Sequence, residues 1–125
     1  MIKGVGIDII EISRIAGEID RYGDTFINRI FAAEEIAYCQ AKARRAQHYA
    51  ARFAAKEAAF KALGSGWQKG VTWREVVVKN DALGKPTLEL RGRAGELAGK
   101  LQATDVQLSL SHSREYAVAV VILEG

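Results

Sequence analysis

Glu57 is a carboxylate in an alanine-rich segment that predicts a helix over residues 44–63. Gly64 is typical of the residue at which such a helix ends. Side chains three and four residues apart lie on one face of a helix, so Glu57 is expected to interrupt an aromatic stripe. The members of that stripe are Tyr49, Phe53 and Phe60. A carboxylate among apolar groups needs an ion pair, hydrogen bonds or a metal, and Lys61 is a candidate partner one turn further on.

A second carboxylate, Asp8, follows a glycine-rich pattern near the N-terminus. Residues 2–9 predict a buried strand with alternating faces. One face carries Val5, Ile7 and Ile9, and the other carries Gly4, Gly6 and Asp8. Glycines within a strand often mark the close approach of another backbone or a ligand. If this strand packs against the predicted helix, Asp8 and Glu57 meet at one place, where like charges in an apolar setting need a cation between them.

The composition indicates a small folded protein. A length of 125 residues fits one domain, residues 1–125, and a hydrophobic content of 49% is that of a globular chain. A net charge of +3 suits an anionic partner but is small for a nucleic-acid-binding surface. The one cysteine, Cys39, allows no intrachain disulfide and fits a reducing compartment. There is no signal-peptide pattern and no apolar run of about 18 residues, so we expect a cytoplasmic protein without a membrane partner.

The expected elements indicate the α+β class, with an antiparallel sheet packed against the long helix. Further helices are predicted over residues 12–22, from Asp24 or Thr25 to Ile30, and over 33–41 and 93–103. Further strands are predicted over residues 72–79, 87–91, 106–111 and 116–123, which are rich in β-branched and aromatic residues. Gly64-Ser65-Gly66 begins a loop that runs through Gly70.

Each chemical signal also has an ordinary structural explanation. Asp8 can bond a nearby backbone N–H at a strand end, and Glu57 can be a simple intrahelical partner of Lys61. The basic residues of the long helix can form a solvated face, as most charge runs do. That run comprises Arg44, Arg45, Arg52, Lys56 and Lys61.

Three other kinds of site are not favoured. Ser111, His112 and Ser113 are adjacent in sequence, whereas a catalytic triad is a spatial arrangement, and no Gly-x-Ser-x-Gly elbow is present. The two histidines and the cysteine are too few and too scattered for zinc. The loop after the long helix lacks the Gly-x-x-x-x-Gly-Lys pattern of a phosphate-binding loop.

Taken together, the motifs resemble one known family. They are Gly4-x-Gly6-x-Asp8 with Arg14, then Arg52-Phe53-x-x-Lys56-Glu57-Ala58-x-x-Lys61-Ala62-x-Gly64, then Gly84-Lys85-Pro86, then Leu108-Ser109-Leu110-Ser111-His112. In this order they are similar to the holo-[acyl-carrier-protein] synthases, the small single-domain members of the 4′-phosphopantetheinyl transferase superfamily. The resemblance covers the chain from end to end and implies the 4′-phosphopantetheinyl transferase fold.

The resemblance implies a reaction. Coenzyme A donates its 4′-phosphopantetheine arm to a serine of apo acyl carrier protein and releases adenosine 3′,5′-bisphosphate, a step of fatty acid biosynthesis. The implied cofactor is Mg²⁺, held by Asp8 and Glu57, and Mg²⁺ does usually take one or two carboxylates plus substrate phosphates. Glu57 and Lys61 are the implied catalytic residues, with Lys61 acting on the pyrophosphate as a point charge.

The resemblance also implies binding roles. Donor contacts are expected from Lys61, Gly64, Arg52 and His112, the last two for the donor's phosphates and above all its 3′-phosphate. The sites of the family lie between the subunits of a homotrimer, so His112 is expected to serve a neighbour's site.

Carrier-protein docking is expected from basic residues of the first predicted helix, Arg14 and Arg21, because acyl carrier proteins are acidic. An ordinary reading of Arg14 is a surface arginine that pairs with Glu11 or Glu18.

Two other function classes remain open. A non-catalytic module could bind an anionic partner through basic residues of the long helix, Arg44, Arg45, Arg52 and Lys56, but it leaves Asp8 and Glu57 unexplained. A metal-dependent nucleotide pyrophosphatase would use ligands similar to Asp8 and Glu57.

Overall fold

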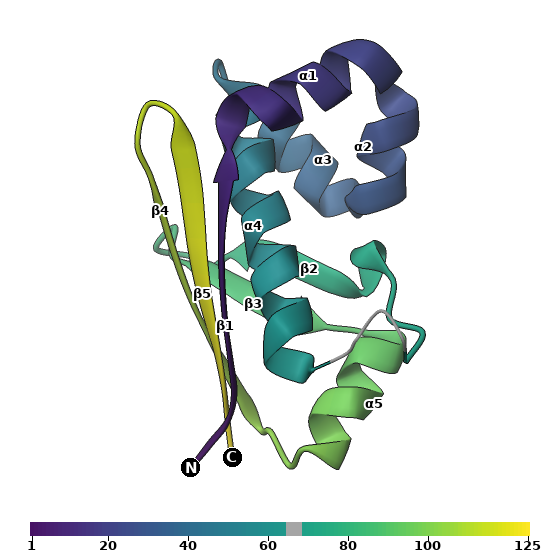
Figure 1. Ribbon diagram of the computed structural model, residues 1–125, viewed down its shortest axis with the longest axis vertical. Helices are drawn as coiled ribbons and strands as arrows, with labels where there is room; N and C mark the ends of the chain where they lie inside the picture. The colour runs from purple at the N-terminus through teal and green to yellow at the C-terminus, as the bar shows by residue number, and fades with distance from the viewer. Residues whose placement is uncertain (65–68) are drawn as a thin grey trace.

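A central helix, α4, lies between a three-stranded sheet and the remaining elements (Figure 1). The computed structural model describes residues 1–64 and 69–125. In chain order its elements are β1 (Ile2–Glu11), α1 (Ile12–Tyr22), α2 (Asp24–Ile30), α3 (Ala33–Gln40), α4 (Arg45–Leu63), the 3₁₀ helix η1 (Trp73–Glu75), β2 (Val76–Asn80), β3 (Pro86–Leu90), α5 (Gly92–Lys100), β4 (Asp105–His112) and β5 (Tyr116–Glu124). The predicted α+β class, with an antiparallel sheet against a long helix, is confirmed.

Both sheets are antiparallel. The larger one has the order β1-β5-β4, with Ile7 of β1 opposite Val120 of β5 and His112 of β4 opposite Ala117 of β5. Strands β2 and β3 form a separate hairpin. The chain ends lie together at one end of β1 and β5 (Figure 1), where the N-terminal ammonium donates to the carbonyl oxygen of Gly125 at 2.9 Å.

Two glycines let α4 pack closely on β1. A Cβ at Gly6 would overlap the carbonyl of Ala58, lying 2.8 Å from its carbon, and a Cβ at Gly4 would lie 3.1 Å from the carbonyl carbon of Ala62. These atoms belong to the backbone of α4, which, unlike a side chain, cannot rotate out of the way. The predicted close approach at the glycine-bearing face is therefore present, and the neighbour is α4 itself.

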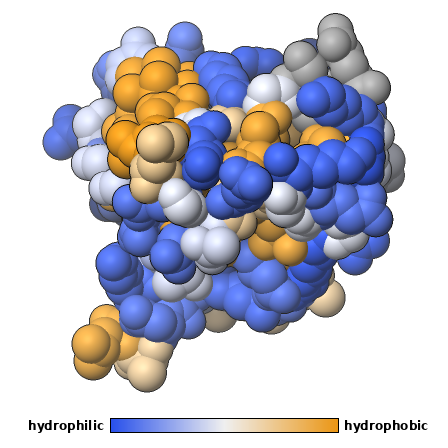
Figure 2. Space-filling model, turned by 90° about the horizontal axis from the view of Figure 1, so that it is seen from below, coloured by the Kyte–Doolittle hydropathy of each residue, from blue (hydrophilic) through white to orange (hydrophobic). Residues whose placement is uncertain are grey.

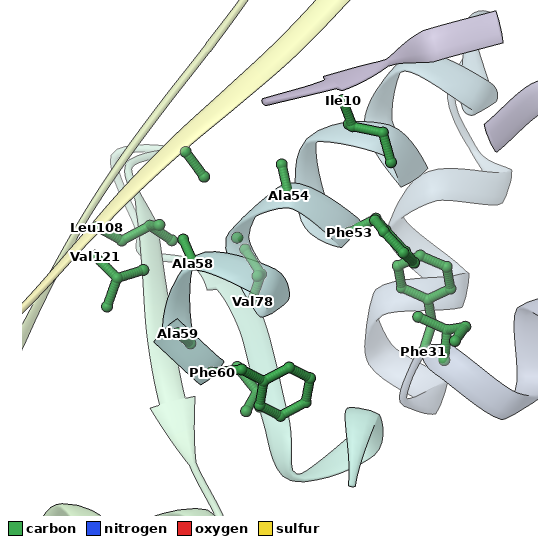
Figure 3. Close-up of a cluster of buried hydrophobic side chains, with 14 of the residues drawn as sticks. Ile10, Phe31, Phe53, Ala54, Ala58, Ala59, Phe60, Val78, Leu108 and Val121 are labelled. Carbon is green, nitrogen blue, oxygen red and sulfur yellow. The ribbon is translucent and has the colours of Figure 1, made fainter. Parts of the chain in front are cut away.

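The core is built around α4, as Figure 3 shows. Ala54 and Ala58 lie on its sheet-facing side, where Leu108 and Val121 are also found, and Phe53 lies on the other side near Phe31. Small residues on the sheet side keep helix and sheet close, while aromatic residues fill the wider space beneath α1 to α3.

The outer face of the larger sheet is uncovered, which corrects one expectation. The predicted alternation in β1 holds, but Val5, Ile7 and Ile9 are 55%, 59% and 64% exposed and not buried. Their cross-strand partners on β5 are apolar as well: Ile122, Val120 and Val118. Seen from below, hydrophobic patches interrupt the hydrophilic surface (Figure 2). Apolar sheet surface of this kind is typical of a protein interface.

The predicted strand over residues 72–79 is partly wrong. Its first half is the 3₁₀ turn η1, and only Val76 onward is strand. The Glu75 carboxylate accepts from the backbone N–H of Thr72 at 2.7 Å and from its hydroxyl at 3.0 Å, so a capping box outweighs the β preference of Trp73. The loop expected from Gly64-Ser65-Gly66 onward lies mostly in residues 65–68, outside the described residues.

A buried ion pair joins α4 to the elements beside it. Lys56, 0% exposed, donates to Glu35 of α3 at 2.7 Å and to the carbonyl oxygens of Trp73 and Val76. The other Glu35 oxygen accepts from the N–H of Val78 at 2.9 Å. Desolvation lowers the pKa of Lys56, and Glu35 opposes that shift. The expectation that Lys56 belongs to a solvated basic face is therefore wrong.

Candidate active site

Asp8, Glu57 and Lys61 come together where β1 crosses α4. Lys61 Nζ lies 3.2 Å from Asp8 Oδ1 and donates to the carbonyl oxygen of Ile7 at 3.0 Å. Lys61 thus pairs with Asp8 on the strand and not with Glu57 on its own helix, because the glycine-bearing face of β1 brings the strand within reach. The Lys61 side chain is 55% exposed, so this contact can open toward a ligand.

Glu57 is a half-buried carboxylate next to a second negative charge. Desolvation raises the pKa of Glu57, Asp8 raises it further, and Lys61 and Arg14 lower it. Two carboxylates that face each other favour a cation between them. Mg²⁺ binds with only one or two protein carboxylates when substrate phosphates and waters complete its shell, so Asp8 and Glu57 fit that ion.

Arg52 lies on a different side of α4, in a cleft of about 350 Å³. Its side chain is 3% exposed, its Nη2 donates to Asn80 Oδ1 at 2.8 Å, and its Cζ lies 4.0 Å from the centre of the Tyr38 ring. Among the described residues, its buried Nε has no hydrogen-bond partner. A buried guanidinium held by neutral groups retains its attraction for an anion.

His112 ends β4 as an exposed residue on the α4 side of the sheet, opposite Ala117. Strand spacing and residue rise place its Cα roughly 12 Å from that of Asp8. Burial lowers the pKa of His48, and the charge of Arg52 lowers it further, so His48 lies near Arg52. Within the described part of the chain, His112 therefore lies apart from Asp8, and the cleft of Arg52 is lined by neither Asp8 nor Glu57.

The remaining predicted residues surround the carboxylates or extend from them. Gly64, with φ +67°, directly follows α4 and ends it one turn beyond Lys61. Arg14 and Arg21 are exposed on α1, seven residues apart, which is two turns and hence one side of the helix. Arg14 also lines a cleft with Phe53 and with residues of α2.

Sequence reasoning missed three side chains that the structure places in these networks: Tyr38, Asn80 and Glu35. Asn80 directly precedes the Asp81 turn, a common position for a side chain that bonds local backbone, and this was its only signal. Cys39 is buried, and desolvation raises its thiol pKa to about 12, so it is not a nucleophile.

Group transfer at phosphorus depends on well-placed cations and metal-binding carboxylates, and Asp8, Glu57 and Lys61 are groups of these kinds. Residues 4–121 match the family model of the 4′-phosphopantetheinyl transferase superfamily. The chain belongs to this superfamily.

Individual relatives agree over the full length. The holo-[acyl-carrier-protein] synthase of Koribacter versatilis (strain Ellin345) is 51% identical over 124 residues, which is 99% of each chain. The crystal structure of the Neisseria meningitidis enzyme of that name is 33% identical, with a TM-score of 0.91 and complete coverage of both chains. The Helicobacter pylori enzyme, solved in complex with coenzyme A, is 29% identical, with a TM-score of 0.84, and the match covers 96% of this chain and 99% of that one.

These matches confirm the resemblance and the expected fold. Within the described part of the chain, no helix has the length and apolar character needed to cross a membrane.

Proposed function

We propose that this protein is a holo-[acyl-carrier-protein] synthase that transfers 4′-phosphopantetheine from coenzyme A to a serine of apo acyl carrier protein, in fatty acid biosynthesis and in the cytoplasm. The observation that carries the proposal is the Asp8–Lys61–Glu57 cluster in a chain of this superfamily. The serine oxygen bonds to the phosphorus that bears the pantetheine arm, and the proton of the serine hydroxyl is released. The bond from that phosphorus to the bridging oxygen breaks, and adenosine 3′,5′-bisphosphate leaves.

Asp8 and Glu57 would hold Mg²⁺, which supplies charge neutralisation at the pyrophosphate when bound. Lys61 exchanges its contact with Asp8 for the pyrophosphate, because its ammonium is half exposed and already lies beside the carboxylates. A cation aimed at the oxygens on which charge develops stabilises the transition state more than the ground state. Lys61 is therefore a catalytic residue that acts chiefly on kcat.

Arg52 and His112 bind the donor's phosphates, and Gly64 contributes backbone beside Lys61. The support for Arg52 is its buried, unneutralised guanidinium. Because Arg52 and His112 lie apart from the carboxylates of their own chain, we propose that they complete the site of a neighbouring subunit in a homotrimer. The uncovered apolar sheet face that includes Ile7 and Ile9 supports such an assembly.

Arg14 and Arg21 dock the acidic carrier through one side of α1. Arg14 lowers the pKa of Glu57, so this side of the helix lies next to the reacting groups. A carrier bound there presents its serine to the site, and attraction between opposite charges speeds its encounter.

A mass measurement tests the activity. The protein is incubated with coenzyme A, Mg²⁺ and apo carrier protein, and the carrier should gain about 340 Da, the mass of one transferred arm. Release of the nucleotide without a change in the carrier would instead identify a pyrophosphatase. Binding without either product would identify a non-catalytic module, a class that the burial of Lys56 and its pairing with Glu35 disfavour.

A further inference from the structure

Arg52 is a buried cation without an ion pair. None of the ion pairs among the described residues includes it. The charged groups that line the same cleft are already paired: Glu34 with Arg91 at 2.7 Å, and Lys79 with Glu89 at 2.6 Å. A buried charge is normally paired or bound to a ligand. It therefore needs an explanation that this buried guanidinium is held by neutral groups and not by a carboxylate.

Asn80 joins Arg52 to the turn between β2 and β3. Its Oδ1 accepts from Arg52 Nη2 at 2.8 Å, and its Nδ2 donates to the carbonyl oxygen of Gly84 at 3.1 Å. This amide orientation is the one that satisfies both neighbours. Asp81 fixes the turn, because its Oδ1 accepts from the N–H groups of Leu83 and Lys85, both at 2.9 Å. The position of the guanidinium is thus tied to a rigid hairpin end.

The ring of Tyr38 supports the guanidinium on another side. Arg52 Cζ lies 4.0 Å from the ring centre, which is cation–π geometry. A ring face and an amide oxygen orient an arginine without neutralising its charge, whereas a carboxylate would pair with it and repel phosphates. Asn80 and Tyr38 therefore hold the Arg52 guanidinium in place without neutralising its positive charge.

We propose that Asn80 and Tyr38 are positioning residues that hold Arg52 for the donor's 3′-phosphate, and so favour coenzyme A over its 3′-dephospho analogue. This inference rests on the proposed function and deepens it. Neither residue reacts. Both lower the cost of ordering the guanidinium that binds the phosphate, which is preorganisation of the binding site.

Steady-state kinetics with coenzyme A and 3′-dephospho-coenzyme A tests this. Asn80→Ala should raise the KM for coenzyme A about tenfold, equivalent to about 1.4 kcal/mol, with kcat unchanged. The KM for the dephospho analogue should stay at the wild-type value. Asn80→Asp should raise the KM for coenzyme A more than Asn80→Ala does, because the new carboxylate competes with the phosphate for Arg52. Tyr38→Leu should raise the KM for coenzyme A as Asn80→Ala does. Tyr38→Phe keeps the ring and should leave this KM unchanged.

Two controls separate the possible failures. Thr87→Ala changes an exposed side chain on the same hairpin, and Arg52→Ala removes the cation itself. If Arg52→Ala raises the KM for coenzyme A but Asn80→Ala behaves like Thr87→Ala, the positioning role is wrong and the proposed function stands. If Arg52→Ala changes neither KM, the assignment of Arg52 is wrong as well. Equal losses of kcat for both donors would show a merely structural Asn80, and calorimetric titration of adenosine 3′,5′-bisphosphate gives a readout independent of turnover.

Discussion

Replacing Gly6 by alanine tests whether the close approach of β1 and α4 creates the site. The new Cβ would overlap the Ala58 carbonyl and lie 2.9 Å from the backbone nitrogen of Ala62, where real Cβ atoms essentially never lie closer than 3.0 Å. Both obstacles are backbone, so α4 must move away from β1 by about 1 Å to restore normal packing. Overpacking costs typically 1–3 kcal/mol, and we expect about 3 because no side chain can give way.

The same displacement should weaken activity as well as stability. A shift of this size breaks the 3.2 Å contact between Asp8 and Lys61, and it separates Asp8 from Glu57, which moves with Lys61 on α4. A misplacement of about 1 Å can lower a rate about 100-fold. We therefore expect Gly6→Ala to remain folded, with a Tm lower by about 12 °C at about 4 °C per kcal/mol, and a kcat lower by about 100-fold.

Differential scanning calorimetry and single-turnover transfer to the carrier would measure the two effects. The matched control is Gly99→Ala in α5, where an added Cβ meets none of the described residues within 4 Å. Helix propensity predicts a gain of about 0.5–1 kcal/mol for this change. A Gly6→Ala protein with wild-type kcat would refute the argument, since the carboxylates and the lysine would then not depend on this packing.

Four further outcomes follow from the site and the open sheet face. Because the pKa of Glu57 is raised, activity at limiting Mg²⁺ should begin to fall at a higher pH than for an ordinary glutamate, and added Mg²⁺ should move that fall to lower pH. The same raised pKa means that metal-free Glu57→Gln should be more stable than wild type at neutral pH. This advantage declines as pH falls through the raised folded-state pKa of Glu57 and is gone below the unfolded-state pKa. Arg14→Ala should raise the KM for the carrier alone, less so at high salt, whereas Lys61→Ala should lower kcat; equal effects of Arg14→Ala on both KM values would place docking elsewhere. Ile7→Lys should give an inactive monomer in light scattering, and an active monomer would exclude the open sheet face as the interface.

The sequence predicted those parts of the site that depend on periodicity. Alternation in β1 placed Gly4, Gly6 and Asp8 on one face, and the run of alanines predicted α4, so packing of one on the other could be expected. Once the two elements pack, the proximity of Asp8 and Glu57 follows.

The parts that could not be predicted depend on tertiary contacts. A lysine one turn after a glutamate suggests an intrahelical pair, and only the closeness of β1 gives Lys61 the better partner, Asp8. Lys56 belongs to a run of charged residues, and nothing in the neighbouring sequence indicates that it pairs with Glu35 in the core. The 3₁₀ turn at Trp73 could have been predicted, because Thr72-x-x-Glu75 is the capping-box pattern of a helix start. The β propensity of Trp73 favours a strand there instead, and this preference is the weaker one in the structure.

The buried pair of Lys56 and Glu35 limits the order in which this sequence can change. Removing one partner leaves an uncompensated charge in the core, at a cost of about 3–5 kcal/mol against a total stability of about 5–15 kcal/mol. Replacing both with apolar residues of similar volume can be neutral. Evolution by single substitutions must therefore pass through a strongly destabilised intermediate, so the two residues should be kept together or lost together. A library that varies α4 without α3 will recover Lys56 almost every time.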